Sequence, residues 1–396
     1  MKSFIILLAL FFLFGCITPY EPRGIDEVAG ILVVYGIITD DESVITLSRS
    51  RRLTDDDWTV NYIWDARVYV ERDDGTLFPA ELLNPENWWE TPRYVIRNGT
   101  LDTNSRYRLR IEIDEVDFDS DDCYWVGDGW WGQWVCPTNT FEYFSEFSYP
   151  IITPEIDSVF WMKRGRGQPV TIHVATHSPN REVLFYRWSF SEVWEINSER
   201  FHEDFPFRCW NFSFSREILL GSAERTIFGR VTEIIHEIEP WNRRLSVLYR
   251  IDVTQNAISK RAHDYFENIR RNSELTGSIF APIPSELRGN IFSATDPSRY
   301  VIGFIDVSTT TRKRMYISRQ DRLYEPLRLF SCTPKTRDEL CEYHDIPGGV
   351  CGLWDPLAAG YVVYENLPGQ PPTFVQHICV DCTFFGTTQR PDDWPN

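Results

Sequence analysis

Residues 245–255, LSVLYRIDVTQ, give the strongest β-strand signal in the chain. Tyr249, Ile251 and Val253 alternate with charged or polar neighbours, and this period of two is typical of a strand with one buried face. Similar runs on both sides predict a second, mainly β domain over residues 151–330. These runs are VTIHVATH (170–177), EVLFYRWSFSEVWEI (182–196), VTEIIHEIE (231–239), VIGFIDVS (301–308) and RMYISR (314–319).

A first β domain is expected over residues 28–150, because short alternating runs begin at ILVVYGIIT (31–39) and continue to YRLRIEI (107–113). Turn signals such as Asp74-Gly75 and Asn98-Gly99 separate the runs at a spacing of about 8–12 residues. This spacing favours a sandwich. We therefore expect a mainly β protein with two β-sandwich-like domains of the immunoglobulin or fibronectin kind.

One amphipathic helix is predicted over residues 259–276, within the second domain. Ala262, Tyr265, Phe266 and Ile269 follow the helical spacing i, i+3, i+4 and i+7. Ser259 can cap the start of this helix, and Gly277 lies just beyond its end. The apolar face should pack against a sheet.

The composition excludes several classes of protein. Hydrophobic residues make up 42% and charged residues 25% of the 396 residues, which is incompatible with wholesale disorder, collagen or a polytopic membrane protein. The 58 Asp and Glu residues outnumber the 40 Lys and Arg residues, for a formal net charge of −18. That charge repels phosphate backbones, so nucleic acid is not an expected partner.

The first 16 residues, MKSFIILLALFFLFGC, have the form of an export signal: one lysine and then a short apolar run. The run is shorter than the ~20 residues of a spanning helix. Its end, Leu13-Phe14-Gly15-Cys16, resembles the bacterial lipobox, in which cleavage precedes the cysteine and its thiol is acylated. We expect a signal peptide at 1–15, lipidation at Cys16 and a tether over 16–27. An ordinary signal peptide is the alternative.

The remaining eight cysteines favour disulfides, because their number is even and the chain is exported. Cys123 and Cys136 flank one loop and should close it. The connectivity of the others stays open, and five of them define a Cys-rich segment over 331–396. A zinc site built on the C-x-x-C pair is the alternative. The candidates are Cys123, Cys136, Cys209, Cys332, Cys341, Cys351, Cys379 and Cys382.

The most suggestive binding candidate is the aromatic loop CYWVGDGWWGQWVC, residues 123–136, within an insertion over 119–147. Aromatic rings on a rigid loop suit sugar rings, peptides or a groove on a partner. The alternative is that the loop folds back as core between the two domains. The candidate ligand-binding residues are Trp125, Trp130, Trp131 and Trp134.

Other motifs point to no chemistry. The chain contains no G-x-S-x-G, H-E-x-x-H or P-loop sequence, so no catalytic residue is predicted. No metal site or cofactor is predicted either. The acidic stretch over 117–128 has a D-x-D-x-D rhythm, but it lacks the glycine and the glutamate of a calcium loop. A solvated acidic turn is the expectation there, with a weak calcium site as the alternative.

Taken in order, these motifs resemble one family. Tyr186-Arg-Trp188, the sequence EVWE at 192–195, the stretch 248–308 and the closing CVDCTFFGTTQRPDDW are similar to the Bacteroidetes lipoprotein family called domain of unknown function 4249. The start, CITPYEP and ILVVYGIITD, agrees. The resemblance covers about residues 16–394, and the Trp-rich insertion and the richness of the tail in cysteine depart from it.

The resemblance implies an outer-membrane lipoprotein without an established activity, commonly encoded beside TonB-dependent receptors. We therefore expect a non-enzymatic accessory to a TonB-dependent transporter that contributes ligand capture or partner contact. A free-standing surface lipoprotein that binds a glycan or a peptide is the alternative, and a hydrolase is a third hypothesis. The face of the outer membrane stays undecided, because only Glu21 adds negative charge between Cys16 and Arg23.

Overall fold

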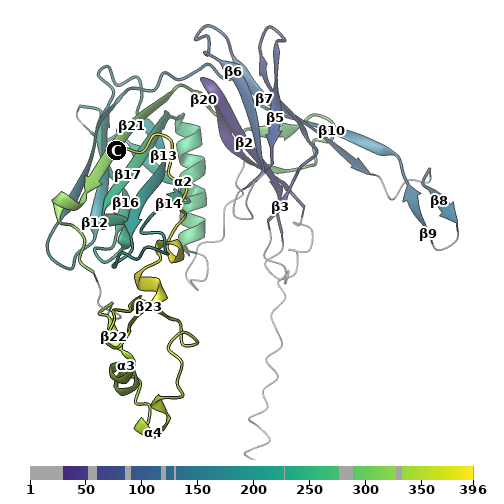
Figure 1. Ribbon diagram of the computed structural model, residues 1–396. Helices are drawn as coiled ribbons and strands as arrows, with labels where there is room; N and C mark the ends of the chain where they lie inside the picture. Colours follow the sequence, from purple (N-terminus) through teal and green to yellow (C-terminus); the bar gives the residue numbers. More distant parts are fainter. Residues whose placement is uncertain are drawn as a thin grey trace, which may run out of the picture.

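The computed structural model describes residues 30–51, 60–84, 91–116, 122–128, 131–226, 228–275, 289–326 and 332–395. Strands dominate these ranges, so the expectation of a mainly β protein is confirmed. Figure 1 shows two β units side by side, a smaller segment that extends from one of them and a hairpin that projects from the other. Among the described residues, no helix is both long and apolar enough to span a bilayer.

Within these ranges, the first unit is one continuous eleven-stranded sheet with the order β18-β10-β7-β4-β5-β6-β2-β1-β19. Two short strands lie off this path, β20 beside β1 and β3 beside β2. Burial alternates along β7, where Leu109 and Ile111 on one face are inaccessible to solvent. The strands are β1 (Leu32–Thr39), β2 (Asp41–Arg49), β3 (Asn61–Tyr62), β4 (Arg67–Arg72), β5 (Leu77–Leu83), β6 (Arg93–Gly99), β7 (Tyr107–Val116), β10 (Thr138–Ser145), β18 (Ile291–Ser293), β19 (Val301–Ile302) and β20 (Val307–Ser308).

This sheet curls until its two ends nearly meet, which makes it barrel-like. The side chain of Asn290 joins the ends: its Nδ2 donates to the Ile305 carbonyl at 2.7 Å, and its Oδ1 accepts from the Ile305 N–H at 2.8 Å. The backbone at Gly289 lies so close to Gly303 that a Cβ on Gly289 would be 1.6 Å from the Gly303 oxygen. Only glycine fits at such an approach.

Two features of the first unit differ from the expectation of a two-sheet sandwich confined to residues 28–150. Its strands follow one path instead of forming two separate sheets, and three of them come from residues 291–308. The parallel pairs Leu32 with Val301 and Ile38 with Val307 bring this distant segment in. Local alternation predicts that a strand exists but not which distant strand it pairs with.

The second unit has two sheets that pack face to face around one core. The smaller sheet has the order β11-β12-β16; the larger has the order β14-β13-β17-β21, with β15 beside β13. Ile172 and Val174 of the smaller sheet share this core with Trp188 and Ile251 of the larger. The elements are β11 (Ile156–Lys163), β12 (Val170–His177), β13 (Phe185–Asn197), β14 (Arg208–Phe214), β15 (Leu219–Ser222), β16 (Arg230–Ile238), β17 (Leu248–Ala257) and β21 (Thr310–Ser318), with the 3-10 turns η1 (Arg243–Leu245) and η2 (Arg319–Asp321).

The strand predicted from LSVLYRIDVTQ is β17, which begins at Leu248 because Leu245 belongs to η1. Tyr249, Ile251 and Val253 are fully buried, which confirms the predicted alternation. Strand β17 lies between β13 and β21 and is therefore central in its sheet.

The predicted helix is α2 (Lys260–Leu275), and Ser259 caps it: its Oγ accepts from the Ala262 N–H at 3.1 Å. Ala262, Tyr265 and Phe266 are buried as their spacing predicted. They pack with Phe185 of β13 and with Phe304, so α2 lies where the two β units meet (Figure 1). Gly277 lies outside the described residues.

The C-terminal segment is small and held by disulfides. It contains β22 (Lys335–Thr336), α3 (Arg337–Tyr343), α4 (Gly348–Cys351), β23 (Tyr361–Glu365), β24 (Thr373–Gln376), η3 (His377–Cys379) and η4 (Cys382–Phe384). Its last residues return to the larger sheet of the second unit. The Trp394 indole N–H donates to Glu195 at 3.0 Å, and Asp393 pairs with Arg250 at 2.7 Å.

Candidate functional site

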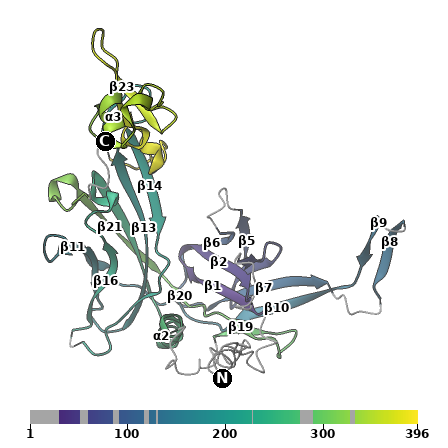
Figure 2. The same cartoon turned by 90° about the horizontal axis from the view of Figure 1, so that it is seen from below.

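The aromatic loop is a two-stranded hairpin, β8 (Tyr124–Asp128) and β9 (Trp131–Val135), closed at its base by the predicted disulfide Cys123–Cys136. Trp125 is paired in register with Trp134, and Asp128 with Trp131. Figures 1 and 2 both show the hairpin extending beyond the ends of β7 and β10, away from the two β units. It is therefore an arm, and its described strands do not fill a gap between the units.

The arm exposes apolar side chains on the described part of β8. The exposed fraction is 59% for Tyr124, 41% for Trp125 and 47% for Val126. For Trp131 and Trp134 the structure places the backbone within β9, and Trp130 lies outside the described residues. Exposed aromatic side chains on a short cross-linked hairpin lose little conformational entropy on binding, so they suit a partner groove or a sugar ring.

The other six cysteines form three disulfides, Cys209–Cys382, Cys332–Cys379 and Cys341–Cys351. The two cysteines of the C-x-x-C pair therefore enter different disulfides, and neither keeps a thiolate for zinc. Across the described ranges, no group of three or more His, Cys, Asp or Glu side chains is placed to hold a metal ion. For the calcium alternative, residues 117–121 lie outside the described residues.

A buried charged cluster on the second unit was not predicted from the sequence. The Glu192 side chain, 1% exposed, accepts from the Tyr249 hydroxyl at 2.8 Å and lies 3.3 Å from His236 Nε2 and 3.1 Å from Arg244 Nη1. Burial alone would raise the pKa of Glu192, but the hydrogen bond and charge of His236, the charge of Arg244 and the Tyr249 hydroxyl together lower it. The carboxylate is thus held ionised.

Two further buried carboxylates also have structural partners. Glu195 accepts from Arg208 Nε at 2.6 Å and from the Trp394 indole. Asp306 accepts from the backbone N–H and the hydroxyl of Ser259 at 2.7 and 3.0 Å, ahead of α2. Burial raises the pKa of Asp306, although the Ser259 hydrogen bonds partly offset that effect. Each of the three carboxylates therefore joins elements that are distant in sequence.

Comparison with known protein families gives one result. The family described as "Domain of unknown function (DUF4249)" matches residues 17–123 and 137–314, which is most of the chain. The chain belongs to this family. No curated protein matches the sequence.

The DUF4249 match helps to delimit the site. It omits residues 124–136, so the aromatic arm lies outside the matched region, although this gap is shorter than the insertion expected over residues 119–147. It also ends at residue 314, earlier than the resemblance over residues 16–394 implied, and therefore leaves out the Cys-rich segment. The Glu192 cluster lies within the DUF4249 match, whereas the arm is an addition to it. Cys16, just before the match begins, lies outside the described residues.

Proposed function

We propose that this DUF4249 protein is a non-enzymatic lipoprotein of the outer membrane, anchored by acylation of Cys16, that assists a TonB-dependent transporter. The arm makes the contact with the transporter or its ligand. The single observation that carries this proposal is the projecting, disulfide-closed hairpin with exposed Tyr124 and Trp125. The hairpin projects from the rest of the protein and exposes aromatic surface, which suits recognition of another molecule.

The absence of a catalytic constellation in the sequence and the structural engagement of Glu192, Glu195 and Asp306 support a binding role. The export signal and Cys16 support the anchor, because the resemblance to the lipobox implies three acyl chains on this cysteine, and two are enough for stable attachment to a bilayer. The acidic net charge of −18 supports partners other than nucleic acid.

Co-purification from native outer membranes in mild detergent tests the proposal. We expect a TonB-dependent transporter to accompany the wild-type protein and to be lost from the variant with Trp125, Trp130, Trp131 and Trp134 replaced by alanine. The matched control replaces Phe228 and Tyr300, exposed by 81% and 64% on the body of the protein, by alanine. This control should retain the transporter.

Recovery of the wild-type protein without a transporter would contradict the accessory role. Mass spectrometry of the same material tests the anchor separately: we expect an acylated Cys16 at the mature N-terminus, and an unmodified thiol there would exclude it. Protease treatment of intact cells decides between the two faces of the outer membrane, because only a surface-exposed arm is cleaved.

The exposed rings of Tyr124 and Trp125 also favour a second candidate, a free-standing surface lipoprotein that binds a glycan or a peptide. If this second candidate is right, the purified protein should bind a polysaccharide or a peptide in the absence of any transporter, which the accessory role does not require. That binding should disappear in the four-tryptophan variant and persist in the control with Phe228 and Tyr300 replaced.

A further inference from the structure

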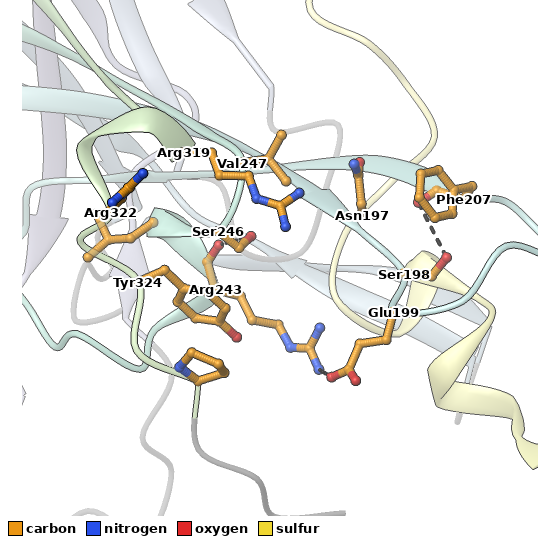
Figure 3. Close-up of a pocket in the computed structure, with 12 residues that line it drawn as sticks. Asn197, Ser198, Glu199, Phe207, Arg243, Ser246, Val247, Arg319, Arg322 and Tyr324 are labelled. Atoms are coloured by element: carbon orange, nitrogen blue, oxygen red, sulfur yellow. Dashed lines mark hydrogen bonds and ion pairs between the residues drawn. The ribbon is translucent and has the colours of Figure 1, made fainter. Parts of the chain in front are cut away.

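A cavity of about 640 Å³ lies at one end of the larger sheet of the second unit, far from the aromatic arm in sequence. Four segments form its wall: the end of β13, the residues before β14, η1 with the residues that follow it, and η2 with the residues that follow it. Its volume lies within the range of small-molecule sites. Figure 3 shows Arg243 turned towards Glu199 and the Arg319 guanidinium directed towards the middle of the cavity.

The charge of this cavity opposes that of the protein. Arg243, Arg319 and Arg322 line it against a single carboxylate, Glu199, in a chain with a net charge of −18. Arg243 is already engaged, because it lies 3.5 Å from Glu199 and its guanidinium carbon is 3.9 Å from the centre of the Phe385 ring. Arg319 and Arg322 have no carboxylate at ion-pair distance among the described residues.

One turn supplies both of these arginines. The 3-10 turn η2 begins at Arg319, Arg322 is its C-cap, and both residues line the cavity. Arg322 has a φ of 55°, in the left-handed region that a non-glycine residue rarely adopts. A side-chain capping box between Ser318 and Asp321 holds the turn in place.

The rest of the wall supplies a neutral donor and apolar surface. Burial raises the pKa of Tyr324, an effect that the charge of Arg243 partly offsets, so its hydroxyl stays protonated and can donate a hydrogen bond at neutral pH. Phe207, Leu245 and Val247 add apolar area beside the arginines. The cavity therefore combines guanidinium forks with a surface for a ring or a short aliphatic group.

We propose that this cavity binds a phosphate monoester, with Arg319 and Arg322 holding the phosphate and Phe207 and Tyr324 contacting its organic group. Guanidinium forks bind phosphate oxygens in bidentate geometry. Three arginines and one glutamate leave a lining charge that matches a doubly negative phosphate better than a singly negative carboxylate. The site is independent of the aromatic arm.

Isothermal titration of the full-length protein in nonionic detergent with phenyl phosphate tests the proposal. We expect binding that weakens at least about tenfold in Arg319→Ala and in Arg322→Ala, since each removes a charge-assisted hydrogen bond. Arg312→Ala is the matched control, because Arg312 is an exposed arginine on β21 that does not line the cavity. It should leave the affinity unchanged.

A variant that is expected to bind phenyl phosphate more tightly is also needed, because a misfolded variant could only bind it more weakly. Glu199→Gln removes the carboxylate that competes for the arginines, so we expect phenyl phosphate to bind a few times more tightly. Benzoate and phenol should bind at least about tenfold more weakly than phenyl phosphate. Equal affinity for benzoate, no change in the two arginine variants, or weaker binding in Glu199→Gln would overturn the proposal.

The same titration distinguishes a free phosphate monoester from a lipid headgroup. Dihexanoyl phosphatidic acid carries the same phosphate on a lipid, and dihexanoyl phosphatidylcholine lacks the monoester. Tighter binding of phosphatidic acid than of phenyl phosphate, with the same dependence on Arg319, identifies a lipid headgroup; the reverse order identifies a soluble ester. No binding of either monoester would refute the site.

Discussion

At the scale of single residues, the most informative group is Glu192, because three distant residues keep its carboxylate ionised inside the second unit. Glu192→Gln removes that charge and leaves the half-buried Arg244 without its anion, so we expect a loss of about 2–4 kcal/mol in the free energy of unfolding at pH 7. Urea denaturation of the two proteins measures this difference.

The lowered pKa of Glu192 fixes the pH dependence of this loss. A carboxyl whose pKa is lower in the folded state stabilises the fold above its unfolded-state pKa of about 4.3, and this stabilisation is lost as the pH falls through the folded value. The difference between wild type and Glu192→Gln should therefore shrink below about pH 4. Glu81→Gln, at an exposed position, is the control. If Glu192→Gln lowered the free energy of unfolding equally at pH 7 and below about pH 4, the lowered pKa of Glu192 would be contradicted.

The role of a single residue can be predicted from the sequence where it depends only on neighbouring residues. The even number of cysteines beyond Cys16, together with the expected export signal, predicted that the eight cysteines pair, and the flanking positions of Cys123 and Cys136 predicted their bond. The remaining connectivity could not be predicted, because it depends on which loops meet in space. Glu192 could not be predicted for the same reason, because its partners His236, Arg244 and Tyr249 are 44 to 57 residues away. Tyr249 lies on the strand paired with β13, His236 on the facing sheet and Arg244 in η1, so only the packing of the whole unit brings them together.

At the scale of elements, the disulfide between Cys209 of β14 and Cys382 joins the Cys-rich segment to the second unit across 173 residues. Replacing both cysteines by alanine should lower the free energy of unfolding by about 2–5 kcal/mol, because the unfolded chain is freed from a long closed loop. The control replaces Cys341 and Cys351, which are 10 residues apart, and should cost about 2.5 kcal/mol less in loop entropy.

Thermal unfolding and limited proteolysis together measure this prediction. Without the Cys209–Cys382 bond, we expect early cleavage between the second unit and the Cys-rich segment, whereas the control should keep the two joined. An equal loss in both variants would show that loop length does not govern the stabilisation.

Elements were predicted better than their pairing. Strand β17 and helix α2 emerged from local periodicity, because each buries one face of a regular pattern. The curled sheet did not, since β19 and β20 are two residues long and pair with β1 across more than 250 residues of chain. The sequence predicted the arm as an aromatic loop from its tryptophans. The direction in which the arm projects depends on where β7 and β10 end, and the aromatic residues of the loop do not indicate this.

At the scale of the whole molecule, the segment over 289–310 connects the two β units. Strand β20 pairs with β1 in the first unit, and Ser308 also forms a bridge with Ile151, just before the second unit begins. Asp40 accepts from the Thr310 N–H at 2.8 Å, where β21 starts. In addition, the Arg187 guanidinium lies 4.6 Å from the Tyr35 ring and 4.5 Å from the Phe266 ring, so β13, β1 and α2 meet at one cation.

These connections predict that a substitution where the two ends of the first sheet meet also destabilises the second unit. Asn290→Leu leaves the backbone N–H and carbonyl of Ile305 unpaired, which should cost about 2–4 kcal/mol. Because β20 and β21 follow Ile305 directly, we expect faster amide hydrogen exchange at Ser308 and Thr310 and a single calorimetric transition at a lower temperature. Asn104→Ala, in an exposed turn, is the control. Two separate transitions, with only one of them shifted, would show that the units fold independently despite the segment they share.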